Sequence, residues 1–165
     1  MTNMQTGLQT PTDLPREALA EVADALNAIL ADTFALFLKS KNFHWHVSGP
    51  YFRDYHLMLD EQAAQILGTT DEIAERIRKT GNTTIRSIGD IARRQRIKDN
   101  DTDFVSAKDM LTELRLDNLA LVRSLHETKR IVDAAGDNAT SGVLDGWTDL
   151  AEGRAWFLFE ASRES

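Results

Sequence analysis

Two pairs of side chains that can bind a metal ion lie on one predicted helix of this sequence. His56 and Asp60 form the first pair, Asp71 and Glu75 form the second, and each pair is four positions apart. Residues at this spacing project from the same side of a helix. Asp60 and Asp71 are about three turns and about 16 Å apart, so the pairs share one side but cannot bind one ion at ligand distances of about 2 Å.

Two arrangements would use both pairs. Each pair binds its own metal, or two copies of the helix pack antiparallel about a two-fold axis, so that the first pair of one chain faces the second pair of the other. The small residues Ala63, Ala64 and Gly68 lie between the pairs and would let two backbones approach closely. This favours the second arrangement and predicts a site that no single chain completes.

Two further histidines, His44 and His46, flank Trp45 just before this helix. One acidic pair on a helix is usually a solvated surface, but three histidines and three suitably spaced carboxylates within 32 residues favour a metal site. Imidazole together with carboxylate suits iron or zinc, whereas calcium and magnesium prefer shells of oxygen alone.

Long helices are needed to position these residues, and the proline distribution permits them. The prolines lie at positions 11, 15 and 50, so the rest of the chain lacks the strongest helix breaker. Apolar spacing predicts a first helix from about residue 15, capped by Thr12 or Asp13 and ended by the break at residues 48–50. A second helix is predicted over about residues 52–79, stopping at Gly81.

A third helix is predicted over about residues 106–135, with Gly136 as terminator, and a fourth runs from a cap at Asp137 or Asn138 toward Arg163. The connection over residues 81–103 is too long for a tight turn and contains a short predicted helix at residues 87–96. The expected fold is therefore an all-α four-helix bundle with a short extra helix between the second and third helices. Residues 1–14 form a short N-terminal tail and residues 15–165 the domain.

Composition limits the function further. The 165 residues, 42% hydrophobic and 27% charged, are typical of one globular domain. The sequence has no cysteine, which excludes disulfides and thiolate sites and fits a reducing cytosol. A formal net charge of -7 disfavours general attraction to nucleic acid and favours cations. With neither a signal peptide nor a membrane-length apolar run predicted, we expect a cytoplasmic protein without a membrane partner.

A di-iron site inside a single bundle would use Glu-x-x-His motifs on facing helices. The residues three positions before the four histidines are instead Lys41, Phe43, Arg53 and Arg123. An intra-bundle site of that kind is therefore not expected.

The stretches KNFHWHVSGPYF at residues 41–52, HLMLDE at 56–61 and DEIAERI at 71–77 resemble the Dps family. These are the DNA-protection proteins of starved bacteria, also called miniferritins. The resemblance is strong over residues 39–81 and extends over the rest of the chain, including the short helix and the Trp156-Phe157-Leu158 run.

The resemblance implies a ferritin-like subunit in a hollow homo-dodecamer, with ferroxidase sites at the two-fold interfaces. His44, His56 and Asp60 would come from one subunit, and Asp71 and Glu75 from its neighbour. The family oxidises ferrous iron, preferentially with hydrogen peroxide, and stores the ferric product in the cavity. Iron is therefore the expected metal, no organic cofactor is expected, and the bacterial cytosol or the vicinity of the nucleoid is the expected location.

The resemblance also leaves open roles and alternatives. His46 stands where the family usually has Asn, and we expect it, like Trp45, to lie behind the ligands; Trp45 would intercept oxidising equivalents or pack an interface. Asp137, Asp145 and Asp149 lie in the region that the resemblance places near a three-fold axis, and they are candidates for a pore through which iron enters. They are equally candidates for an ordinary acidic surface.

DNA binding is expected to be weak or absent. Residues 1–15 contain no Lys or Arg, residues 161–165 contain one Arg, and the cluster Arg93, Arg94 and Arg96 is the only plausible exception. A DNA-compacting structural protein with a secondary metal site is the alternative function. A ferritin-like scaffold that binds zinc without redox turnover is a third.

Overall fold

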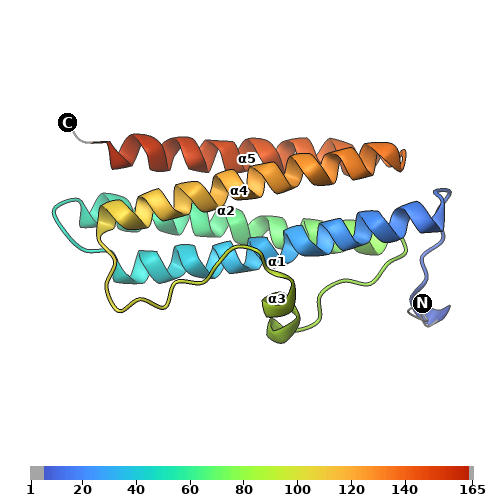
Figure 1. Cartoon of the computed structure of the whole chain (residues 1–165), viewed down its shortest axis with the longest axis horizontal. Helices are drawn as coiled ribbons and strands as arrows, with labels where there is room; N and C mark the ends of the chain where they lie inside the picture. Colours follow the sequence, from blue (N-terminus) through green and yellow to red (C-terminus); the bar gives the residue numbers. More distant parts are fainter. Residues whose placement is uncertain (1–5, 164–165) are drawn as a thin grey trace.

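The computed structural model describes residues 6–163, and within them every regular element is helical. The elements are the 3-10 helix η1 (Thr6–Leu8) and the α-helices α1 (Arg16–His46), α2 (Phe52–Lys79), α3 (Ile88–Arg94), α4 (Ala107–Ala134) and α5 (Asn138–Ser162). Figure 1 shows the four long helices side by side, with α3 beside them. The predicted four-helix bundle with a short extra helix is confirmed.

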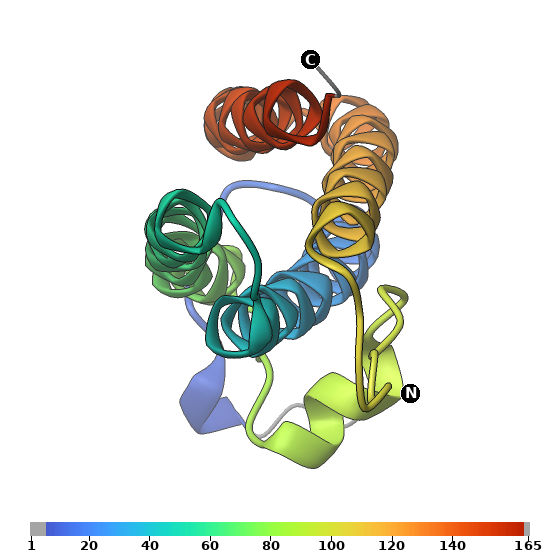
Figure 2. The ribbon, with the colours of Figure 1, turned by 90° about the vertical axis from the view of Figure 1, so that its left-hand side faces the viewer.

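The order of the helices explains how distant residues meet. Helices α1 and α2 form one antiparallel hairpin and α4 and α5 form another. The crossover between them, residues 80–106, returns along the length of the bundle, so that α2 and α4 run parallel (Figure 1). Viewed along the bundle in Figure 2, α3 packs outside α1. The end of α1 and the start of α2 therefore lie together at one end of the molecule.

The residues of α2 divide between a face toward the core and a face toward solvent, as the period of an α-helix requires. Leu59, Ala63, Ile66 and Ile73 are all at most 1% exposed and face the core. The prediction that Ala63 lies on the outer stripe between the ligand pairs is wrong, because it lies four residues after Leu59 and three before Ile66. Ala64 and Gly68 are exposed, as that stripe requires.

The helix ends follow local sequence signals at most positions. The side chain of Asp137 caps α5 by accepting a hydrogen bond from the Thr140 backbone N–H at 3.1 Å, as predicted. The predicted cap of the first helix by Thr12 or Asp13 is wrong. Pro15 occupies that position in an extended conformation without a side-chain cap, and the Thr12 hydroxyl instead accepts from the Leu14 N–H.

Gly81 ends α2 in a conformation that only glycine adopts easily. Its φ is +85°, and a Cβ there would lie 2.8 Å from the Thr10 carbonyl oxygen. Arg78 also donates to the Leu8 carbonyl at 3.0 Å. The described part of the predicted tail is therefore fastened to the end of α2.

A buried ionic cluster ties the crossover to the bundle. Lys39 Nζ on α1 lies 2.6 Å from Glu113 Oε1 and 2.7 Å from Asp117 Oδ2, both on α4, and donates to the Lys98 carbonyl at 2.9 Å. Lys39 is 5% exposed. Burial raises the pKa of Asp117, although Lys39 opposes this. The cluster therefore joins three segments of the fold through one cation.

Among residues 6–163, no helix combines the length and the apolar character that crossing a membrane requires.

Candidate metal centre

Two histidines from adjacent helices form a stacked pair. His44 lies in the last turn of α1 and His56 in the second turn of α2, and the short connection between these helices brings them together. The ring centroids are 3.8 Å apart and the planes are inclined by 19°. His44 is buried and His56 is half-buried. The first two predicted ligands are therefore neighbours within one chain.

The backbone determines which nitrogen of each ring is available. His44 Nδ1 lies 2.7 Å from the His56 carbonyl oxygen, and His56 Nδ1 lies 2.8 Å from the His44 carbonyl oxygen. A carbonyl oxygen only accepts, so each Nδ1 carries the hydrogen and donates it. In the neutral rings, both Nε2 atoms then keep a lone pair, which is the form that binds a metal.

The carboxylate of Asp60 lies beside the two histidines. Its Oδ1 lies 3.9 Å from His44 Nε2 and 2.7 Å from Lys41 Nζ, with about half of the side chain exposed. The hydrogen bond from Lys41 lowers the pKa of Asp60. The carboxylate is thus ionised at neutral pH, but a bound metal ion must compete with Lys41 for the same oxygen.

Replacing Lys41 with methionine is expected to increase the affinity for a divalent cation at pH 7 only about two- to five-fold, since solvent weakens an exposed ion pair. Asp60 would also lose the contact that lowers its pKa, so it would take up a proton more readily. As the pH is lowered, the variant should therefore lose cation binding at a higher pH than wild type does. Titration with Zn²⁺ as a redox-inert probe measures both effects. Lys98→Met, which removes an exposed lysine of the crossover, serves as control. Weaker binding by Lys41→Met would show that Lys41 supports the site.

The acidic pair lies farther along α2, on its exposed side. Glu75 Oε2 is 4.0 Å from Lys79 Nζ, whereas Asp71 forms no hydrogen bond or ion pair within residues 6–163. Between them, Glu72 accepts a hydrogen bond from the buried Trp147 Nε1 at 3.0 Å, which anchors this part of α2 to α5. Asp71 and Glu75 therefore face away from the bundle.

One chain supplies only part of a ligand set. Within the described residues, no three His, Cys, Asp or Glu side chains are grouped so that they could hold a metal. Asp60, Ala64, Gly68, Asp71 and Glu75 are all exposed and follow one another at intervals of three or four residues. This outer stripe is the surface that the predicted antiparallel arrangement needs, and the division of ligands between chains remains a prediction.

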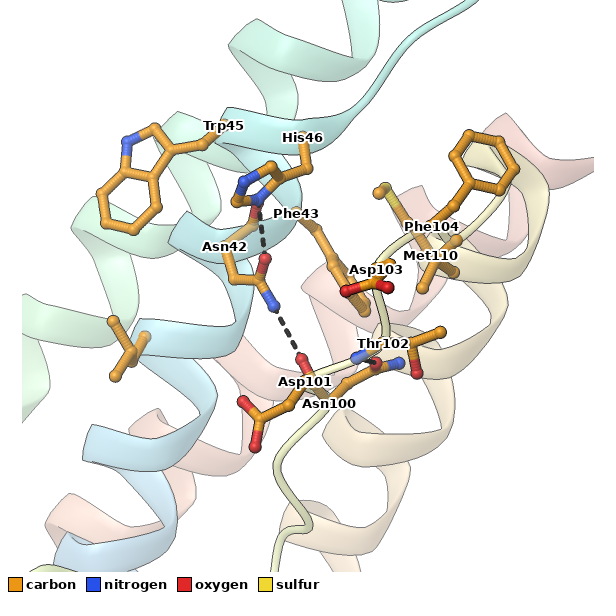
Figure 3. Close-up of a pocket in the computed structure, with 12 residues that line it drawn as sticks. Asn42, Phe43, Trp45, His46, Asn100, Asp101, Thr102, Asp103, Phe104 and Met110 are labelled. Atoms are coloured by element: carbon orange, nitrogen blue, oxygen red, sulfur yellow. Dashed lines mark hydrogen bonds between the residues drawn. The ribbon is translucent and has the colours of Figure 1, made fainter.

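His46 and Trp45 contact groups other than the two stacked rings. His46 Nδ1 lies 2.8 Å from both the carbonyl and the side-chain oxygen of Asn42, which in turn donates to the Asn100 carbonyl at 3.0 Å (Figure 3). Trp45 is 58% exposed, and its ring centroid lies 5.8 Å from Lys41 Nζ. Trp45 thus lies beside the lysine that contacts Asp60, and both Trp45 and His46 line a cavity of about 550 Å³ beside the crossover.

The three carboxylates suggested for a pore differ in their surroundings. Asp137 is 4% exposed, and both of its oxygens bond Thr140. Asp145 is exposed and lies 3.0 Å from Lys129 Nζ. Asp149 is exposed one turn further along α5. Asp145 and Asp149 are therefore available to a passing cation, whereas Asp137 is occupied as a helix cap.

Each arginine of the basic cluster in the crossover pairs with a carboxylate of the same chain. Arg93 and Arg94 pair with Asp90 at 3.5 and 3.0 Å. Arg96 pairs with the buried Asp32 at 2.7 Å. The cluster is thus an anchored and salt-bridged surface rather than a free cationic patch.

One group of polar side chains lies between α2, α4 and α5 in the described part of the bundle. It consists of Arg154, Asn118 and Gln62, with Gln65 at the edge. A guanidinium repels a ferrous ion and neutral amides bind it only weakly, whereas di-iron bundles use several inward carboxylates. These four side chains offer no carboxylate to a metal ion, and the expectation that no such site exists inside the bundle stays a prediction.

Several features of the site escaped the sequence analysis. The Lys41 contact with Asp60 and the Trp147 contact with Glu72 join residues from different helices. The only signal in the sequence was position: Lys41 lies one turn before His44, and Glu72 lies beside Asp71.

Comparisons with known proteins agree with the observed fold. Residues 23–161 match the family described as Ferritin-like domain. The DNA protection during starvation protein of Brevibacillus brevis is 32% identical over 83% of this chain and 91% of its own length. A low temperature-induced protein of Nostoc sp. is 34% identical over 83% of this chain and 77% of its own. A crystal structure of a Dps protein from Bacillus brevis has a TM-score of 0.86 at 29% identity, covering 93% of this chain and 100% of the other.

Proposed function

This chain belongs to the Dps family of ferritin-like proteins, and on that basis we propose that it is a ferroxidase that oxidises ferrous iron, preferentially with hydrogen peroxide. The ferric product is stored as mineral inside a dodecameric shell. Iron storage and DNA protection are general functions of the family. The choice of oxidant, the shell and the ligand set are the specific parts of the proposal.

The observation that supports the proposal most directly is how the two histidines are hydrogen-bonded. Both Nδ1 atoms donate to backbone carbonyls, so in the neutral rings both Nε2 atoms keep a lone pair, and His44 Nε2 lies 3.9 Å from the ionised carboxylate of Asp60. Neutral imidazole and carboxylate together form a ligand set that suits iron. Asp71 and Glu75 of a neighbouring chain would add the oxygens that stabilise the more highly charged ferric ion.

The reaction balances as a two-electron reduction of the oxidant. Two ferrous ions each give one electron to one molecule of hydrogen peroxide, which takes up two protons and leaves as two molecules of water. Paired electron transfer avoids the one-electron step that releases a hydroxyl radical. DNA would then be protected by removal of both reactants. We propose that the shell lies in the compartment that holds the DNA, the bacterial cytosol.

The direct test adds ferrous iron and peroxide to the assembled protein and follows ferric absorbance, with oxygen alone as the second oxidant. Oxidation no faster than in protein-free buffer would reject the ferroxidase, and stoichiometric zinc binding without turnover would favour the zinc scaffold. Solution mass measured on the same sample tests the shell, which we propose to have a mass of about 222 kDa for twelve chains. Asp145 and Asp149 are proposed to attract iron as it enters.

We predict that the protein protects DNA chemically rather than by coating it. Twelve chains with a net charge of -7 each would give a particle with a net charge of about -84, which repels phosphate. Arg93, Arg94 and Arg96 are already paired with carboxylates. A gel shift should show no stable complex near 0.15 M salt, where charges are screened beyond about 8 Å. The same preparation should prevent nicking of DNA by ferrous iron and peroxide. Tight binding at that salt concentration would make DNA compaction the better account.

A further inference from the structure

The polar core of the bundle contains a cation that no acidic side chain neutralises. Arg154 on α5 is 5% exposed. Its Nε donates to Asn118 Oδ1 at 2.8 Å, and one terminal nitrogen donates to Gln65 Oε1 at 2.7 Å. Both acceptors are neutral amides, and within the described part of the chain no carboxylate pairs with the guanidinium. The positive charge is therefore uncompensated.

Such a charge is costly unless something else approaches it. Burial alone lowers the pKa of Arg154 to about 10, so the group stays charged at neutral pH. A guanidinium has five N–H donors, and only two of them are used by Asn118 and Gln65. An anion with several oxygens would satisfy both the charge and the remaining donors.

A cavity of about 270 Å³ adjoins this group between α2 and α5. Arg154 and Gln62 are its buried polar members, and Met58, Leu150 and Phe157 contribute apolar walls. Glu61 and Asp149 also line it, and both residues are exposed. The cavity thus has a cation at its inner side and two carboxylates toward solvent.

We propose that this cavity binds inorganic phosphate on the Arg154 guanidinium, together with an iron cation held between the phosphate and the carboxylates of Glu61 and Asp149. A free phosphate is repelled by the two carboxylates, but a cation placed between them joins both partners. Binding of phosphate and cation is therefore cooperative. The iron half of the inference rests on the proposed function, whereas the phosphate half does not. The site would seed ferric phosphate within the stored mineral.

The test is equilibrium dialysis of labelled phosphate against the assembled, metal-free protein, with and without Zn²⁺ as a redox-inert cation. At a phosphate concentration below saturation, we expect wild type to retain well under one phosphate per chain without metal. Retention should rise several-fold with Zn²⁺, toward one phosphate per chain. The same rise is expected in Asp60→Ala, which removes a predicted ligand of the ferroxidase site. Since no oxidation is involved, failure here and failure of the ferroxidase proposal are separate results.

Without metal, removal of the arginine and removal of the carboxylates should change phosphate retention in opposite directions. Arg154→Met should abolish retention under both conditions, whereas Arg163→Met, which removes an equal but exposed charge, should leave it unchanged. Glu61→Gln/Asp149→Asn should retain more phosphate than wild type without metal, and it should lose the increase with Zn²⁺. If Arg154→Met does not assemble, the double variant still tests the proposal. It should bind more phosphate than wild type without metal and less than wild type with Zn²⁺, and general damage to the protein would not cause both changes.

Equal retention by wild type and Arg154→Met, or no effect of the carboxylate substitutions, would overturn the site. AMP provides the last comparison, since the small cavity should exclude its nucleoside. Binding of AMP as strong as that of phosphate would assign the signal to the open surface and likewise overturn the inference.

Discussion

Replacing Asp60 with alanine is expected to reduce the initial rate of ferrous oxidation by peroxide about 100-fold or more, while the shell assembles normally. The carboxylate is exposed and pairs with Lys41 at 2.7 Å and His44 at 3.9 Å, so its loss should disturb the fold little. Loss even of groups that only support metal ligands costs about 10- to 100-fold. Stopped-flow absorbance, with solution mass as control, measures the effect. A well-assembled variant with the wild-type rate would remove Asp60 from the site.

Complementation tests whether two chains share each site. His56→Ala/Asp60→Ala chains and Asp71→Ala/Glu75→Ala chains should each be inactive. Mixed shells should regain part of the activity, because an interface between the two kinds of chain keeps one complete ligand set. Tagging both chains verifies the mixing, and no recovery in verified mixed shells would contradict the shared site.

The second large effect is expected from Lys39→Met, which should destabilise the protein by about 3–5 kcal/mol at pH 7.5. The substitution leaves the carboxylates of Glu113 and Asp117 together without their cation and removes the donor to the Lys98 carbonyl. The midpoint of thermal unfolding should fall by about 10 °C. Lys79→Met, whose side chain is 62% exposed, should change it little.

The loss should shrink as the pH is lowered from 7.5 toward 5. Burial already raises the pKa of Asp117, and removal of Lys39 removes the charge that opposes this. A carboxyl whose folded pKa is raised binds protons more readily in the folded state, so its contribution to stability is full below the unfolded pKa and is lost as pH rises through the folded one. Comparing both proteins at several pH values measures this difference. A deficit that stays constant or grows in acid would contradict the assignment.

The sequence predicted the helices well because their ends carry local signals. Gly81 and Gly136 have positive φ angles just beyond helix ends, and Asp137 caps the next helix. The error at Ala63 arose because small size alone was taken to mark an outer surface, although the neighbouring Leu59 and Ile66 already placed this position inside. Local signals therefore determine where helices end, while the side that a residue faces depends on the whole apolar pattern.

The ligand types and spacings were also visible in the sequence, but their partners were not. The exchange of hydrogen bonds between His44 and His56 needs the backbone geometry of the α1–α2 connection. Arg154 lies next to the apolar residues of α5, and only the packing of three helices shows that Asn118 and Gln65 surround it. Such contacts join positions 12 to 89 residues apart, which periodicity along one helix does not report.

The exposed stripe on α2 has a kinetic consequence if ligands are shared as proposed. Each newly made chain would carry both half-sites but no working centre, and centres would appear only through encounters between chains, at a rate that depends on the square of their concentration. A cell would then hold little activity at low expression and gain it steeply as the protein accumulates. Dilution would reverse this, so the amount of protein itself would act as the switch.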